Sequence, residues 1–222
     1  MGTLYLVRHG QASFGADDYD QLSPLGQRQS VRLGEYFRRN NVTFNTVLTG
    51  TLRRQQQTYA GIAQGAAFSQ TALLWPGLNE YDSAALIATI HPQPLEKPDT
   101  PELYRHHFRL LRDGLTQWMK GDVSPQGMPS YRAFQSGVSS ALDHIRQHCE
   151  GNVLLVSSGG PIATAVSQVL GTPPETTVEL NMRIRNSAVT EFTFTQKRHA
   201  LLSFNTLPHL ERLSSADWIT YA

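Results

Sequence analysis

Short apolar runs that alternate with longer amphipathic stretches constrain the fold of this chain most strongly. Residues 4–7 and 153–156 are almost entirely apolar, and runs of this length are typical of buried strands. Helical signals separate these runs, and the clearest is Ser23-Pro24, an N-cap hydroxyl followed by a proline. Strands that alternate with helices predict an α/β fold. We expect strands at 3–8, 45–49, 72–75, 153–156, 188–195 and 200–204, and helices at 24–39, 51–64, 102–119, 131–149 and 161–170.

The two ends of this pattern differ from its middle. The last two expected strands are joined by a turn around Gln196-Lys197, which predicts an antiparallel edge of the sheet. The region 81–129 contains clustered prolines, and we expect it to be a helical insertion that packs over one end of the sheet, within a single domain of residues 1–222. Its aromatic and basic side chains either face a substrate or pack internally; they are Tyr104, Arg105, His106, His107, Phe108 and Arg109.

Composition excludes several classes of function. With 40% hydrophobic residues, 17% charged residues and a net charge of +1, the chain is typical of a soluble globular protein, and we expect no nucleic-acid or membrane partner. The single cysteine, Cys149, excludes an intramolecular disulfide and a cysteine-based metal cluster. We find no signal peptide and no apolar run long enough to span a membrane, so a cytoplasmic location is expected.

Arg8-His9-Gly10 directly follows the first apolar run. Ligands of open α/β sheets bind outside the carboxyl ends of the strands, so a cation and an imidazole at this place suit an anionic substrate. Gly10 would let the backbone turn sharply and come close to that ligand. The alternative is a strand that ends in an ordinary polar turn.

Three further places carry candidate chemistry. Arg54 lies in the first turn of the helix after the second strand, where the alternative is a solvated surface arginine. Ser157-Ser158-Gly159-Gly160-Pro161 follows the strand at 153–156 and opens a helix, so its free N–H groups could bind an anion; a plain tight turn is the alternative. Glu80 follows the third strand and could act as a general acid, unless it is merely solvated.

Taken together, these segments resemble the histidine phosphatase superfamily, which has the phosphoglycerate-mutase-like fold. The matching stretches are Leu6-Val7-Arg8-His9-Gly10, which carries the Arg-His-Gly motif, Asp20-Gln21-Leu22-Ser23-Pro24-Leu25-Gly26, Leu52-Arg53-Arg54-Gln55-Gln56-Gln57-Thr58, Leu78-Asn79-Glu80 and Val156-Ser157-Ser158-Gly159-Gly160-Pro161-Ile162. Residues 186–190 and 202–205 are similar to its closing strands. The resemblance covers nearly the whole chain and selects Arg54 rather than Arg53.

The resemblance implies a three-layer sandwich, with a mostly parallel central sheet, one antiparallel edge strand and helices on both faces. It implies a phosphomonoesterase of a small phosphorylated molecule, in which His9 carries a phosphohistidine intermediate. Arg8 and Arg54 would bind the phosphoryl oxygens, and Glu80 would act as acid and then base. Because the arginines neutralise the phosphate, no metal or other cofactor is implied. Further phosphate ligands are expected in the adjacent loops: Gln11, Ser13, Ser158 and Gly159.

The chain departs from the family at one catalytic position. Ser158 stands where the family has its second histidine, and serine can donate a hydrogen bond but supplies no charge. Loss of one such donor costs about 10²–10³ in rate, so we expect reduced activity and a faster Ser158→His variant. The alternative is a catalytically weak relative that binds a phosphorylated ligand or a protein partner. The retained His9 and Glu80 favour the enzyme, because binding alone needs neither.

The chain also lacks a feature of the family's mutases. Members that act on phosphoglycerate usually carry a Trp-Asn pair after the Arg-His-Gly motif, whereas this chain reads Ser13-Phe14-Gly15-Ala16. A phosphatase is therefore favoured over a mutase. The substrate is expected to be selected by the insertion, and a homodimer is compatible with the sequence.

Overall fold

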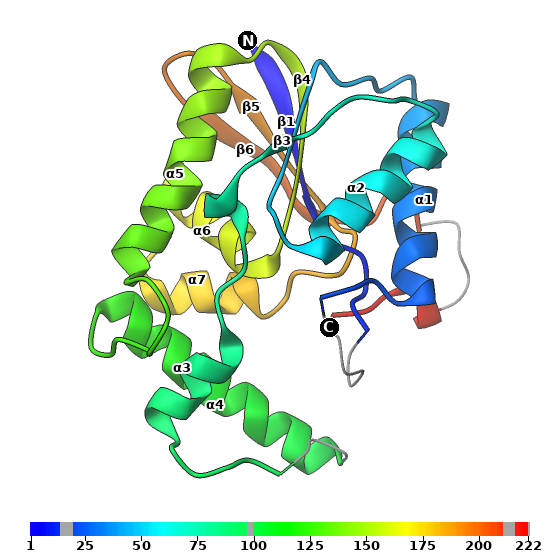
Figure 1. Ribbon diagram of the computed structural model, residues 1–222. Helices are drawn as coiled ribbons and strands as arrows, with labels where there is room; N and C mark the ends of the chain where they lie inside the picture. Colours follow the sequence, from blue (N-terminus) through cyan, green and yellow to red (C-terminus); the bar gives the residue numbers. More distant parts are fainter. Residues whose placement is uncertain (14–19, 97–99, 211–215, 222) are drawn as a thin grey trace.

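The computed structural model describes residues 1–13, 20–96, 100–210 and 216–221, and within them six strands form one mixed sheet (Figure 1). The strands stand in the order β3-β2-β4-β1-β5-β6. β5 runs antiparallel to both of its neighbours, β1 and β6, and the remaining pairs are parallel. The expected α/β fold, with a mostly parallel sheet and an antiparallel edge, is confirmed. The strands are β1 (Gly2–Arg8), β2 (Thr46–Thr49), β3 (Leu73–Leu74), β4 (Gly151–Ser157), β5 (Val189–Phe194) and β6 (His199–Thr206).

Helices cover both faces of the sheet (Figure 1). One face carries α1 (Pro24–Arg39) and α2 (Arg53–Ala66), and the other carries α5 (Tyr131–His148), α6 (Gly159–Leu170) and α7 (Pro174–Asn181). Strand β1 shows why two cores result, because successive side chains of a strand point to opposite faces. Leu4 and Leu6 pack in the core under α5 and α6, whereas Tyr5 and Val7 pack in the core under α1 and α2.

Local signals explain the start of α1 and the need for a glycine beside it. The Oγ of Ser23 accepts a hydrogen bond from the backbone N–H of Gly26 at 3.0 Å, which satisfies one free donor of the helix N-terminus. Gly10 passes so close to this turn that a Cβ there would lie 2.4 Å from the carbonyl oxygen of Gly26. A side chain at position 10 would therefore collide with helix α1, and this contact holds the Arg-His-Gly segment in place. The close approach of Gly10 to a ligand stays a prediction.

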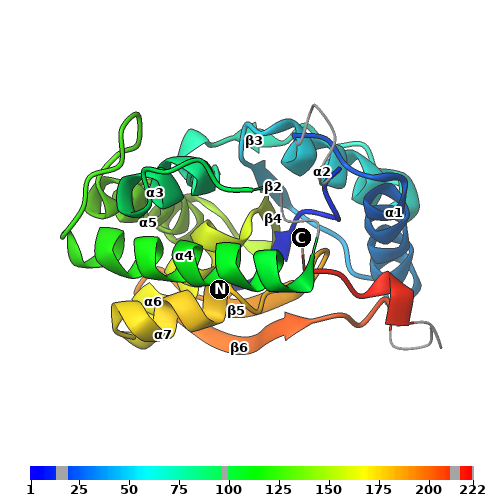
Figure 2. The same ribbon diagram turned by 90° about the horizontal axis from the view of Figure 1, so that it is seen from below.

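Two further helices, α3 (Ser83–Ile90) and α4 (Pro101–Lys120), belong to the segment 81–129. Figure 1 shows them beyond the carboxyl ends of the strands, and Figure 2 shows α4 crossing in front of that edge on the side of α6 and α7. Arg112 of α4 forms an ion pair with Glu179 of α7, and Lys120 forms another with Glu175 at 2.6 Å. None of the described helices is long and apolar enough to cross a membrane.

The C-terminal segment returns to the carboxyl edge of the sheet. It includes a short 3-10 turn at Ala216–Trp218, and a second such turn, Pro76–Leu78, follows β3. The carbonyl oxygen of Thr220 accepts from the backbone N–H of Asn186 at 2.9 Å, and Gln29 of α1 donates to the carbonyl oxygen of Trp218 at 2.9 Å. These bonds place Tyr221 beside the segment that ends β1.

Candidate active site

A cavity of about 440 Å³ lies at the carboxyl edge of the sheet, as expected for an open α/β sheet. The end of β1, the first turn of α2 and the segment after Pro76–Leu78 form its floor. Arg8, His9, Arg54 and Glu80, which come from these elements, all line it. The structure thus brings together the four residues that the sequence selected as catalytic.

His9 is buried, and its ring is held in one tautomer. Its Nδ1 lies 2.7 Å from the carbonyl oxygen of Gly10, so Nδ1 carries the proton and donates. The Nε–H of Arg54 then donates to the lone pair of Nε2 at 3.2 Å. Burial lowers the pKa of His9 well below 6.5, and the charges of Arg8 and Arg54 lower it further. The result is a neutral imidazole whose Nε2 lone pair faces the guanidinium group of Arg54.

The backbone around His9 is fixed from the far side. Its carbonyl oxygen accepts from the backbone N–H of Ser187 at 3.1 Å and from the side-chain amide of Asn186 at 3.3 Å. Next to it, the N–H of Gly10 donates to Thr58 at 3.0 Å. Ser187 is held in turn by His209, at 2.9 Å. These contacts leave His9 little freedom, which suits a nucleophile that must act in line.

Asp20 positions Arg54. Its carboxylate accepts from the backbone N–H of Arg53 at 2.8 Å and from Nη1 of Arg54 at 2.8 Å. The same carboxylate therefore caps helix α2 and orients the guanidinium toward His9. We did not select Asp20 from the sequence as a site residue. The sequence does contain a signal for this residue, because Asp20 is the first residue of the family motif that runs from Asp20 to Gly26.

Arg8 is held by two backbone carbonyl oxygens. Its Nη1 donates to the carbonyl oxygen of Ile184 and, at 2.8 Å, to that of Tyr221. The C-terminal segment thereby takes part in orienting this arginine, which the sequence did not reveal. Two guanidinium groups from different elements consequently face one cavity, an arrangement suited to a phosphoryl group.

Glu80 binds the N-terminus of helix α6. Its carboxylate oxygens lie 3.0 and 3.2 Å from the backbone nitrogen of Gly160, and one also accepts from the N–H of Tyr81 at 3.3 Å. Burial raises the pKa of Glu80, although the Gly160 N–H and the charges of Arg54 and Arg8 oppose the shift. The helix start expected to bind phosphate thus binds a carboxylate of the protein through Gly160, while Gly159 still lines the cavity.

Ser158 lies behind the cavity wall. It is fully buried, is not among the residues lining the cavity, and its Oγ accepts from Nε2 of Gln55 at 2.9 Å. The same amide of Gln55 donates to the carbonyl oxygen of Leu78 at 2.9 Å, and Gln55 is itself fully buried. Gln55 therefore fills the space next to position 158. No sequence signal singled out this residue.

Gln11 and Ser13 lie in the segment after β1, beside the residues that lead into α1, and outside the lining of the cavity. The Oε1 of Gln11 accepts from the Oγ of Ser23 at 2.7 Å, and its backbone N–H donates to Gln29 at 2.9 Å. The backbone N–H of Ser13 donates to Gln21 at 2.8 Å. Gln11 thus connects the segment after the Arg-His-Gly motif to α1, and Ser13 connects it to the residues that precede α1. The part of both residues in phosphate binding stays a prediction.

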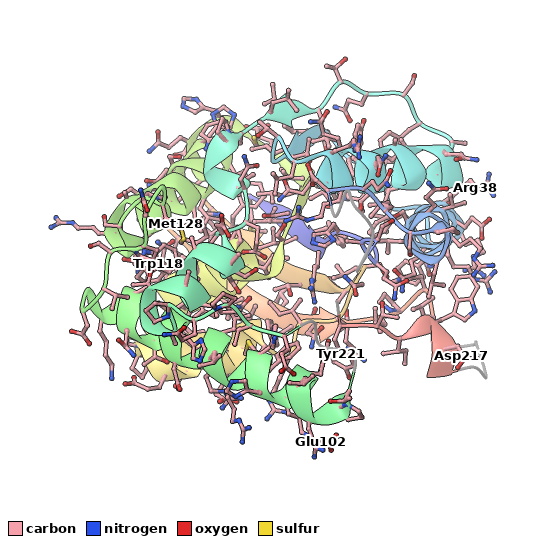
Figure 3. The ribbon with its side chains drawn as sticks, turned by 60° about the horizontal axis from the view of Figure 1, so that its bottom comes forward. Arg38, Glu102, Trp118, Met128, Asp217 and Tyr221 are labelled. Carbon is pink, nitrogen blue, oxygen red and sulfur yellow. The ribbon has the colours of Figure 1, made fainter. Side chains whose placement is uncertain are left out.

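The wall of the cavity that lies away from the sheet comes mainly from α3, α4 and the end of α7. Tyr104, His107 and Phe108 of α4 line it, whereas Arg105, His106 and Arg109 do not. Figure 3 labels Glu102 and Trp118 at opposite ends of α4, with Tyr221 on the side of Glu102. The lining residues that the sequence did not indicate are Leu52, Tyr81, Asp82, Ser83, Ile87, Leu111, Asn181, Met182 and Tyr221.

The family is established by comparison with known proteins. A model of the histidine phosphatase superfamily (branch 1) matches residues 4–207. The chain therefore belongs to the histidine phosphatase superfamily.

Individual relatives agree with this assignment. The chain is 26% identical over 198 residues to the "Probable phosphoglycerate mutase GpmB" of Yersinia enterocolitica, covering 86% of this chain and 84% of the relative. A phosphoserine phosphatase from Entamoeba histolytica, solved with 3-phosphoglyceric acid, has the same fold at 21% identity and a TM-score of 0.66, covering 95% of this chain and 100% of that one. YhfR of Bacillus stearothermophilus superimposes with a TM-score of 0.68 at 18% identity, with coverages of 95% and 100%.

Proposed function

We propose that this protein is a metal-independent phosphomonoesterase that transfers the phosphoryl group through His9 to water. One observation carries the proposal: a neutral buried imidazole has its Nε2 lone pair 3.2 Å from Arg54 Nε, in a cavity that also holds Arg8 and Glu80. Mere binding of a phosphate would be better served by a protonated histidine. A neutral one is a nucleophile.

In the first step, Nε2 of His9 attacks phosphorus and the bond to the ester oxygen breaks. Arg8 and Arg54 stabilise the charge on the three remaining oxygens, and Nε of Arg54 shifts its hydrogen bond from Nε2 to one of them. Glu80, whose pKa is raised by burial, acts in its protonated form and gives its proton to the leaving oxygen. The product alcohol departs, and the phosphoryl group remains on His9.

In the second step, a water molecule attacks phosphorus while the carboxylate of Glu80 takes one of its protons. The P–N bond breaks and inorganic phosphate leaves, which restores neutral His9 and protonated Glu80. The hydrogen bond from Nδ1 to the carbonyl oxygen of Gly10 holds the ring in position through both steps, because Nδ1 keeps its proton throughout. Charge neutralisation comes from the arginines, so we expect activity in the presence of EDTA.

The segment 81–129 acts in this proposal as a cap that selects the substrate. Structural neighbours support a small phosphorylated molecule: their names include a phosphoserine phosphatase and a glucosyl-3-phosphoglycerate phosphatase. The relative named as a probable phosphoglycerate mutase makes mutase activity the competing reaction within the same family.

We expect Glu80→Gln to act through the leaving group. General acid catalysis contributes about 10²–10⁴-fold, and alkyl phosphates need it because an alkoxide leaves poorly. The variant should therefore lose about 10²-fold or more in kcat/KM on hexyl phosphate, but less than about tenfold on 4-nitrophenyl phosphate, whose phenolate leaves unprotonated. The measurement is kcat/KM for both esters with wild-type and variant enzyme.

The pH profile is the control for that experiment. Glu80 donates a proton only below its pKa, which burial raises above 4.5, so wild-type activity on hexyl phosphate should fall on the alkaline side of the profile. Glu80→Gln should remove this alkaline limb. An equal loss on both esters with an unchanged pH profile would contradict the role of Glu80 as the acid.

A second candidate function is a catalytically weak relative that binds a phosphorylated ligand. The specific observation in its favour is the neutral pair of Ser158 and Gln55, which occupies the place of the family's second histidine. Phosphate binding without turnover by the wild-type chain would decide for it.

A further inference from the structure

The cavity continues from the phosphate end into a region with a different character. Its outer wall is apolar or aromatic: Ile87 of α3, Tyr104, Phe108 and Leu111 of α4, and Met182 after α7. Tyr104 and Phe108 lie one helical turn apart, and their rings are in contact, with centroids 4.6 Å apart and planes tilted by 45°. Such a wall stabilises a bound ligand, because it removes the apolar part of the ligand from water.

Charge in the same cavity is distributed unevenly. Of the described residues that line it, Arg8 and Arg54 are the only arginines and there is no lysine, and both arginines belong to the phosphate end. The arginines of α4 nearest in sequence, Arg105 and Arg109, lie outside the lining. The outer region instead contains Asp82, whose carboxylate caps α3 by accepting from the N–H groups of Ala84 and Ala85 at 2.9 and 3.0 Å.

Two polar side chains in this region already form hydrogen bonds within the protein. His107 donates through Nε2 to the carbonyl oxygen of Glu96 at 2.9 Å. Asn181 donates to the hydroxyl of Tyr81 at 2.8 Å. A carboxylate on the substrate would thus meet an acidic side chain and apolar rings, and the described lining offers it no arginine or lysine beyond the two at the phosphate end.

From this distribution we infer that the enzyme selects phosphomonoesters of apolar alcohols that carry no second anionic group, and that Phe108 is a residue that sets this specificity. The inference rests on the proposed phosphatase function. It separates this chain from enzymes that act on phosphorylated acids, which need a cation at the far end of the site. The phosphate is bound by the arginines, and the alcohol lies between α3, α4 and Met182.

Three esters whose leaving groups are all primary alcohols test this inference: propyl phosphate, hexyl phosphate and the ω-carboxylate of hexyl phosphate. Each buried methylene is worth about three- to fourfold in binding, so kcat/KM should rise by about tenfold or more from propyl to hexyl phosphate. Burial of a carboxylate without a partner should lower kcat/KM by about tenfold or more relative to hexyl phosphate. Equal or reversed values in either comparison would overturn the inference.

A matched pair of variants locates the effect. Phe108→Lys places a cation inside the outer wall and should bring the kcat/KM of the ω-carboxylate up to that of hexyl phosphate or above it. Leu110→Lys adds the same charge to α4 at a position outside the lining and should leave the wild-type ratio unchanged. If Phe108→Lys leaves the ratio unchanged, Phe108 does not set specificity. No turnover of any ester by wild-type enzyme would instead refute the phosphatase function itself.

Discussion

Replacement of His9 by alanine is expected to lower kcat/KM for 4-nitrophenyl phosphate by a factor on the order of 10³ or more. The loss follows because the variant has no atom that can form the P–N bond, and water would have to attack the ester directly between Arg8 and Arg54. The measurement is the release of 4-nitrophenol in buffer that contains EDTA, where wild-type activity should persist.

A second histidine serves as the control. His148 lies exposed at the end of α5 and does not line the cavity. His148→Ala should keep wild-type activity in the same assay. Equal rates for wild-type enzyme and His9→Ala would contradict the proposed mechanism. They would favour the alternative, a catalytically weak relative that binds a phosphorylated ligand.

The second prediction with a large expected effect concerns the replacement of Ser158, whose hydroxyl contacts Gln55. The sequence alone led us to expect a faster enzyme from Ser158→His, but the structure places Ser158 in a fully buried position, with the amide of Gln55 at 2.9 Å from its Oγ. An imidazole added there would overlap Gln55, and overpacking costs about 1–3 kcal/mol. We therefore expect the single variant to be less stable and no faster than wild type.

The double variant Gln55→Ala/Ser158→His removes the obstacle. It should recover stability relative to Ser158→His, and the new imidazole should provide a donor near the phosphate, worth about 10²–10³-fold in rate. Urea unfolding measures the first effect, and kcat/KM for 4-nitrophenyl phosphate measures the second. A stable, faster single variant would show that Gln55 leaves room for an imidazole. A stable double variant no faster than wild type would show that position 158 does not reach the phosphate.

The sequence predicted the parts of the fold that local chemistry decides. Helix α1 begins at Pro24 because the Ser23 hydroxyl caps it, and that signal is contained in four residues. The buried strands β1 and β4 follow from their uninterrupted apolar runs. Helices α3 and α7 were missed. The start of α7 at Pro174 directly follows Pro173, and such a proline pair indicates a break, while α3 is short and capped only by Asp82.

The site was predictable where one strand or helix end supplies the residue. Arg8 ends β1, and His9, Arg54 and Glu80 follow the ends of β1, β2 and β3, so all four meet at the carboxyl edge. Contacts between distant segments were not predictable. The bond from Gly160 to Glu80 joins residues 80 positions apart and gives the anion site at α6 to a protein carboxylate.

The same limit applies to the wall opposite the phosphate end. It depends on how α4 lies across the sheet, which no periodicity in the sequence defines.

A phosphorylation trap tests the central claim most directly. Wild-type enzyme is exposed briefly to a ³²P-labelled phosphomonoester, quenched in alkali and digested. We predict acid-labile label on the peptide that contains His9, and none in His9→Ala. Label on another residue, or turnover by wild-type enzyme without any labelled histidine, would contradict the account.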